Sequence, residues 1–153
     1  MKTALLLLLL ATPAAAQPLP DYSDNRSTAA DVIQSLYNAI NRHEYLRAWS
    51  YYRDGAAPSF PSFAAGYENT FSVEIQLGKV TQDGTAGATH YSVPVALRAR
   101  DTADHITVFE GCYTLIEVDP SVQETPPFRP IQIDSGRLQK TAKSFPKAMG
   151  TCN

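Results

Sequence analysis

Residues 90–118 show the clearest hydrophobic pattern in the chain. Every second residue from Tyr91 to Ala99 is apolar, and the alternate positions include Ser92 and Arg98 and continue to Arg100. Side chains on a strand point alternately to its two faces, so this pattern predicts a strand with one buried face. Residues 101–104, with an Asp at each end, favour a tight reversal, and the β-branched and aromatic residues of 105–118 predict the return strand.

The chain before this hairpin has helical periodicity. Thr28 followed by Asp31 has the spacing of a capping box, and an apolar stripe comes after it: Val32, Ile33, Leu36, Tyr37 and Ile40. A second amphipathic segment carries Tyr45, Ala48, Trp49 and Tyr52, and it is predicted to end at residues 53–55. A short helix is expected over residues 61–67, because Pro at a first turn favours helix initiation.

Two further strands complete the predicted sheet. Residues 71–77 alternate with period two, and residues 128–138 carry Ile131 and Ile133 as a core pair. Residues 82–87 are interpreted as a turn, and residues 140–153 as a tail. Helices that precede an antiparallel sheet indicate an α+β domain in which the helices pack on one face of four strands.

The first sixteen residues are interpreted as a secretory signal peptide. Lys2 precedes an apolar run, and residues 14–16 form a small-residue cleavage site. This run is too short to span a bilayer, so no membrane anchor is expected and the mature protein is predicted to be periplasmic or secreted. Residues 17–27 are expected to be a flexible lead-in, and residues 28–153 a single domain.

Charge and cysteine content narrow the classes of function. The formal net charge is −2, which gives no reason to expect a nucleic-acid partner. Cys112 and Cys152 are expected to form a disulfide in an exported protein, and the alternative is a metal-binding or catalytic thiol. No histidine lies at ligand spacing from either cysteine, so neither a metal nor another cofactor is predicted.

Residues 37–49 have the pattern Tyr-x-Ala-Ile-Asn-Arg-x-x-Tyr-x-x-Ala-Trp, which resembles the helical opening of the nuclear transport factor two-like (cystatin-like cone) superfamily. Residues 109–115 are similar to the long curved strands of the same superfamily. The resemblance implies a bent, mainly antiparallel sheet with the helices packed in its concave face, and a cone whose open end can hold an apolar ligand. Members include ketosteroid isomerases, polyketide cyclases, dehydratases and transport adaptors, so the fold does not select a function.

Glu110 is the candidate catalytic residue. If Ile106, Val108, Cys112 and Thr114 face inward, Glu110 shares their apolar surroundings, and burial would raise its pKa toward the range of a general acid or base. The alternative is a bulge at residues 110–111 that turns Glu110 to solvent.

The candidate ligand-binding residues are aromatic: Tyr37, Trp49, Tyr52 and Tyr113. Their alternative role is core packing. Arg98 and Arg100 could bind a carboxylate or be solvated. Asp134 is expected at the surface or at the rim of the cone. All three histidines are expected at the surface: His43, His90 and His105.

Two functions follow from these observations. The first is an exported, non-catalytic module that binds a small apolar ligand or a partner protein, with a homodimer through the outer sheet face as one form. The alternative is a small isomerase or lyase of the ketosteroid isomerase or polyketide cyclase kind, acting in the cone with Glu110 as proton carrier and a tyrosine as hydrogen-bond donor.

Overall fold

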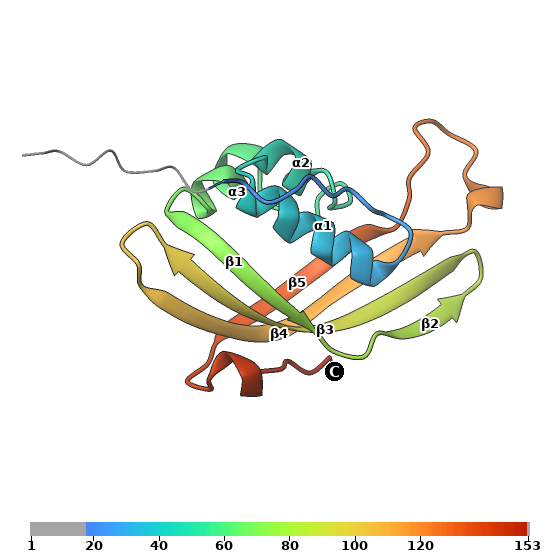
Figure 1. Ribbon diagram of the computed structural model, residues 1–153. Helices are drawn as coiled ribbons and strands as arrows, with labels where there is room; N and C mark the ends of the chain where they lie inside the picture. The colour runs from blue at the N-terminus through green and yellow to red at the C-terminus, as the bar shows by residue number, and fades with distance from the viewer. Residues whose placement is uncertain (1–17, 153) are drawn as a thin grey trace, which may run out of the picture.

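The computed structural model describes residues 18–152. The predicted signal peptide therefore lies outside the described residues. Within them, three α-helices lie in the hollow of a strongly curved antiparallel sheet (Figure 1). The predicted α+β cone, with its helices on the concave face, is confirmed.

The first helix, α1 (Ala29–Asn41), begins where the capping pattern predicts. The Thr28 hydroxyl oxygen accepts a hydrogen bond from the Asp31 amide at 3.1 Å, which satisfies one of the free N–H groups of the first turn. Its apolar stripe is almost completely buried, and the fully buried members include Val32, Ile33 and Leu36. This burial places α1 at the centre of the core.

Two shorter helices follow α1. The second, α2 (Tyr45–Trp49), ends before Tyr52, so the second amphipathic segment is only partly helical. The third, α3 (Phe60–Gly66), begins one residue before its predicted start and carries Pro61 in its first turn. Gly55 between them has φ +80, a conformation that glycine adopts without steric cost.

Within residues 18–152 the sheet has five strands, not the predicted four: β1 (Thr70–Leu77), β2 (Thr81–Thr85), β3 (Ala88–Asp101), β4 (Ile106–Val118) and β5 (Gln132–Lys140). The order is β1-β3-β4-β5, and β2 pairs with β3 beyond the end of β1. The turn predicted over residues 82–87 is confined to residues 86–87, because Thr81–Thr85 is a strand. All five residues of β2 are exposed, so its sequence has no apolar alternation to reveal it.

The concave side of the sheet holds the core. Val93, Val95 and Leu97 of β3 and Tyr113 and Leu115 of β4 are all buried against the helices. These residues have odd numbers, as the alternation predicts for β3.

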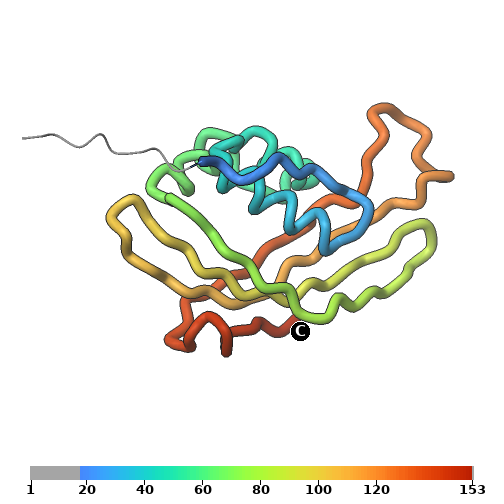
Figure 2. Tube along the Cα trace, in the orientation of Figure 1, coloured from blue at the N-terminus to red at the C-terminus, as the bar shows by residue number. Residues whose placement is uncertain are grey.

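The N-terminal segment, residues 18–27, packs along the helices (Figure 2). The Asn38 side chain donates to the Asp21 carbonyl at 2.7 Å and accepts from the Ser23 amide at 3.1 Å. Arg47 donates to the Ser23 carbonyl at 2.8 Å, and its guanidinium lies 4.5 Å from the centre of the Tyr22 ring. The segment that was expected to be a flexible lead-in is thus hydrogen-bonded to α1 and α2.

The C-terminal tail, residues 141–152, crosses the convex side of the sheet, opposite the helices (Figure 1). Cys112 of β4 and Cys152 form the predicted disulfide, which closes a separation of 40 residues. Gly150 packs so tightly against β4 that an added Cβ would lie 1.9 Å from the Gly111 carbonyl oxygen. Within residues 18–152, no helix is long and apolar enough to cross a membrane.

Candidate functional site: an inner pocket bordered by tyrosines

An apolar pocket of about 400 Å³ lies between α3 and the concave face of the sheet. Phe63, Gly66 and Tyr67 form the side contributed by α3 and its end. The opposite wall comes from four strands and consists of Val73, Leu97, Phe109 and Leu138, with Thr70 and Ala99 beside them. The curvature of the sheet is what brings these four strands around one space.

Tyrosines from four different parts of the fold gather beside this pocket: Tyr37, Tyr52, Tyr67 and Tyr113, called here the tyrosine cluster. The hydroxyls of Tyr37 and Tyr113 are hydrogen-bonded at 2.6 Å. The Tyr37 and Tyr113 rings meet edge to face, with centroids 6.4 Å apart. The inner end of the pocket is therefore apolar but carries phenol groups.

Tyr67 differs from the hydrogen-bonded pair of Tyr37 and Tyr113. Its ring lines the pocket and contacts Phe63, with centroids 5.1 Å apart. Within residues 18–152, no side-chain or main-chain group forms a hydrogen bond with the Tyr67 hydroxyl. The Tyr45 hydroxyl donates at 3.3 Å to the main-chain carbonyl oxygen of Tyr67, not to its side chain. Tyr67 thus offers the pocket a hydroxyl that makes no hydrogen bond within residues 18–152.

Burial raises the pKa of all four phenols. The pKa values of Tyr37 and Tyr113 lie well above the ordinary value because both residues are buried, and burial also raises those of Tyr52 and Tyr67. The ionised form loses its hydration in the interior, so these hydroxyls stay protonated at neutral pH. A protonated phenol both donates and accepts a hydrogen bond.

Trp49 of α2 contributes to the pocket indirectly. Its indole N–H donates to the Pro58 carbonyl at 2.9 Å, and its ring meets that of Phe60 edge to face at 6.3 Å. Pro58 borders the pocket. Three of the four predicted aromatic residues, Tyr37, Tyr52 and Tyr113, do come together, whereas Trp49 lies behind the pocket wall.

Glu110 lies on the other side of the sheet. Its carboxylate accepts from the Lys143 ammonium of the tail at 2.9 and 3.0 Å and from the Met149 amide at 3.3 Å. The Lys143 hydrogen bond holds the pKa of Glu110 below its usual value, the opposite of the direction expected for burial in the cone. The side chain is 12% exposed.

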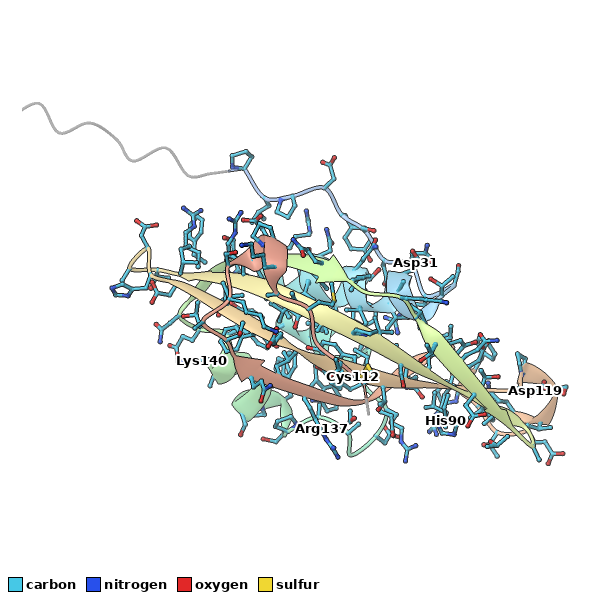
Figure 3. The ribbon with its side chains drawn as sticks, turned by 90° about the horizontal axis from the view of Figure 1, so that it is seen from below. Asp31, His90, Cys112, Asp119, Arg137 and Lys140 are labelled. Atoms are coloured by element: carbon cyan, nitrogen blue, oxygen red, sulfur yellow. A yellow bond between two sulfur atoms is a disulfide. The ribbon has the colours of Figure 1, made fainter. Side chains whose placement is uncertain are left out.

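Both sequence interpretations of Glu110 are therefore wrong. Ile106, Val108, Cys112 and Thr114 do share a face with Glu110, as the alternation requires, but this face is the convex one. Residues 110–111 keep a regular register with β3, so no bulge turns Glu110 outward in that pairing. Figure 3 views the molecule from below and shows Cys112 near the middle of the sheet.

The remaining charged candidates are engaged in surface contacts. Arg98 donates to the Glu74 carboxylate at 3.0 Å, and Arg100 lies 3.4 Å from Asp104. Asp134 forms an ion pair with Arg53 at 3.0 Å. All three histidines are exposed, as expected: His43, His90 and His105.

None of the described residues that line the inner pocket carries a charge or an imidazole. Across residues 18–152, no group of three or more His, Cys, Asp and Glu side chains is arranged to hold a metal ion. Tyr67 is one of the pocket residues that the sequence did not assign to the site, and it is the one among them that carries a phenol. It ends a segment rich in aromatic residues (58–67), and that clustering is the signal that could have indicated it.

No family model and no curated protein matches the chain. Among solved structures, the chain is similar to a candidate dehydratase from the NTF2-like family from Streptomyces avermitilis, with 13% identity, a TM-score of 0.46, and coverage of 73% of this chain and 93% of that one. It is also similar to a chain of the Mtr2–Mex67 M domain complex of C. albicans, with 14% identity, a TM-score of 0.40, and coverage of 87% of this chain and 85% of that one.

Proposed function

We propose that the protein is an exported binding module whose inner pocket takes a small, neutral, mainly apolar ligand with one hydrogen-bond-accepting oxygen. The observation that carries this proposal is the Tyr67 hydroxyl, which has no hydrogen-bond partner within residues 18–152 and borders a pocket of about 400 Å³ whose described lining is uncharged. Ligand pockets of this size are typically apolar, with a few polar groups that fix orientation.

The apolar lining supports an apolar ligand body. Burying apolar surface is favourable by about 25 cal/mol per Å² removed from water, so a flat hydrocarbon skeleton gains affinity against Phe63, Leu97 and Phe109. An aromatic skeleton can also meet the ring of Phe63 or Phe109 edge to face.

The absence of charge among the described lining residues supports a neutral ligand. A carboxylate in this pocket would lose its hydration without gaining a cationic partner, which is strongly unfavourable. A carbonyl oxygen loses less, and the protonated phenol of Tyr67 can donate to it.

The position of Glu110 argues against the enzymatic alternative in its original form. An isomerase or lyase acting in the cone needs a proton carrier beside the ligand, and Glu110 lies beneath the tail on the convex face. The inner pocket presents phenols without a carboxylate among its described lining residues, so binding is the function that this geometry favours.

Export is part of the proposal for two reasons. Residues 1–16 have the composition of a signal peptide, and a disulfide such as Cys112–Cys152 persists in an oxidising compartment. Fractionation of the native cells tests this directly. Recovery of full-length, reduced protein from the cytoplasm would contradict export.

Three naphthalene derivatives of similar shape test the pocket by calorimetry: the ketone 2-acetonaphthone, the hydrocarbon 2-isopropylnaphthalene and the anion 2-naphthoate. We expect the ketone to bind most tightly and the anion to bind at least about tenfold more weakly. Tyr67→Phe is expected to weaken ketone binding about threefold to tenfold and to leave hydrocarbon binding unchanged, because only the ketone accepts the hydrogen bond.

A pair of glycine variants provides the matched control. Gly66 lines the pocket and Gly84 lies on β2, and a Cβ added at either position meets no atom within 4 Å. Gly66→Leu is therefore expected to abolish binding by filling the pocket, and Gly84→Leu to leave it intact. Equal binding of all three compounds, or unchanged binding to Gly66→Leu, would contradict the proposal.

A further inference from the structure

The outer edge of β1 is occupied at one point by a side chain that takes the place of a neighbouring strand. Asn41, the last residue of α1, donates from its amide nitrogen to the Val73 carbonyl at 2.9 Å and accepts from the Val73 amide at 2.7 Å. Both main-chain groups of Val73 therefore point away from β3, the strand paired with the opposite edge of β1.

The antiparallel ladder extends this orientation along β1. Val73, Ile75 and Leu77 face Ala99, Leu97 and Val95 in a regular register. Because the hydrogen-bonding direction alternates along a strand, the N–H and C=O groups of Ile75 and Leu77 point to the same outer edge as those of Val73. Within residues 18–152, no main-chain or side-chain group outside the sheet ladder bonds to the main chain of Ile75 or Leu77.

A hollow of about 450 Å³ runs beside this edge, between β1 and α1. The helix side is formed by Gln34, Asn38 and Asn41, which share one face because they lie four and three residues apart. The strand side is formed by Ile75 and Leu77, which are half-buried. No charged side chain is among the described residues that line the hollow.

We propose that this edge and hollow bind an extended segment of a partner protein, which adds to the sheet as a strand beside Ile75 and Leu77. The Asn41 amide, chemically equivalent to a peptide group, already pairs with both main-chain groups of Val73. The next outward-facing groups lie about 6.8 Å further along β1, the spacing at which an extended chain repeats its own groups.

The chemistry of the hollow identifies the kind of segment. Main-chain pairing supplies the affinity in strand addition, and pockets for alternate side chains supply the selectivity. An apolar side chain of the segment would contact Ile75 and Leu77. The side-chain amide of Gln34, which has no hydrogen-bond partner within the described residues, could bond to the main chain of the segment. The uncharged lining selects an uncharged stretch of peptide.

The experiment uses the whole protein labelled with nitrogen-15 and a blocked hexapeptide of alternating Thr and Val. In the free protein, the Ile75 and Leu77 amides are expected to exchange rapidly with solvent. Adding the peptide is expected to slow both, with chemical-shift changes at these amides and at the Gln34 side chain. The same peptide, N-methylated at alternate residues on its pairing edge, is expected to bind at least about tenfold more weakly, because it has lost those donors.

Two variants separate this surface from the inner pocket. Ile75→Pro removes an N–H that points away from β3, so the sheet pairing is retained while peptide binding is lost. Tyr67→Phe is expected to weaken ketone binding in the inner pocket without changing peptide binding, so the two proposals fail independently. If Ile75→Pro does not fold, the N-methylated peptide still provides the test.

Four results would overturn the proposal: slow exchange of the Ile75 amide in the free protein, the absence of any peptide-induced change at Ile75 and Leu77, equal binding of the N-methylated peptide, or shifts confined to the inner pocket. Protection of Ile75 that rises with protein concentration alone would assign the edge to a second copy of the chain and would also overturn it.

Discussion

The hydrogen bond between Tyr37 and Tyr113 provides the sharpest test of the buried site. Both residues are 2% exposed, and their hydroxyl oxygens lie 2.6 Å apart. Tyr113→Phe keeps the ring but removes one hydroxyl, which leaves the Tyr37 hydroxyl buried without its partner. An unsatisfied buried polar group costs about 1–3 kcal/mol, and we expect a loss of unfolding free energy in this range.

The two single variants are expected to cost about the same. Each removes one hydroxyl of the pair and leaves the other buried without its partner. The double variant removes both buried hydroxyls while keeping both rings, and it is expected to cost less than the two single variants together by about 1–2 kcal/mol.

Urea denaturation followed by circular dichroism measures each free energy, and an unchanged m-value shows that the folded state is comparable among variants. Tyr22→Phe is the matched control, because Tyr22 is 60% exposed and its change is expected within about 0.5 kcal/mol. Single-variant losses below about 0.5 kcal/mol together with zero coupling would refute a buried phenol pair.

Three further predictions concern the tail and the tyrosine cluster. Gly150→Ala is expected to destabilise the protein by about 1–3 kcal/mol in thermal unfolding, because its Cβ would lie 1.9 Å from the Gly111 carbonyl oxygen, and Gly84→Ala is expected to show no such loss. Replacing Cys112 and Cys152 by Ala is expected to lower the unfolding free energy by up to about 4 kcal/mol for the 40-residue separation, and equal urea midpoints for native and double-variant protein would contradict a stabilising bridge. The folded-state pKa values of the tyrosine cluster are raised above 10.0, so the cluster contributes fully to the free energy of unfolding below about pH 10. Above this pH the phenols ionise in the unfolded state, and the free energy of unfolding falls by up to about 1.4 kcal/mol per pH unit for each tyrosine. A urea midpoint that stays constant between about pH 9 and 11 would refute this last prediction.

The sequence predicted the elements whose burial is one-sided. The stripe on α1 and the alternation on β3 each separate one buried face from one polar face, and Thr28 marks the helix start by its side-chain hydrogen bond to Asp31. The strand β2 was missed because it is exposed on both faces and is held by main-chain pairing to β3, which has no side-chain signature.

The face of β4 that points into the cone could not be predicted for a different physical reason. Both faces of this strand are covered, one by the helices and the other by the tail, so apolar residues occur at even and odd positions alike. Glu110 was therefore grouped correctly with Val108 and Cys112 but assigned to the wrong side. The larger aromatic side chains, Phe109 and Tyr113, lie on the inner face, and their size was the available clue.

The tail and the inner pocket are linked through the same short stretch of β4. Gly111 pairs with Leu138 of β5. On one side of it in the sequence, Phe109 lines the pocket together with Leu138. On the other side, Cys112 forms the disulfide that holds the tail. A Cβ at Gly111 would lie 1.9 Å from the Arg137 carbonyl oxygen, so only glycine permits this close approach of β4 and β5. Gly150 then rests on the opposite side of the Gly111 backbone. The pocket wall and the position of the tail thus both depend on the absence of a side chain at Gly111. Through this residue, the packing of the tail on the convex face is coupled to the packing of the pocket on the concave face.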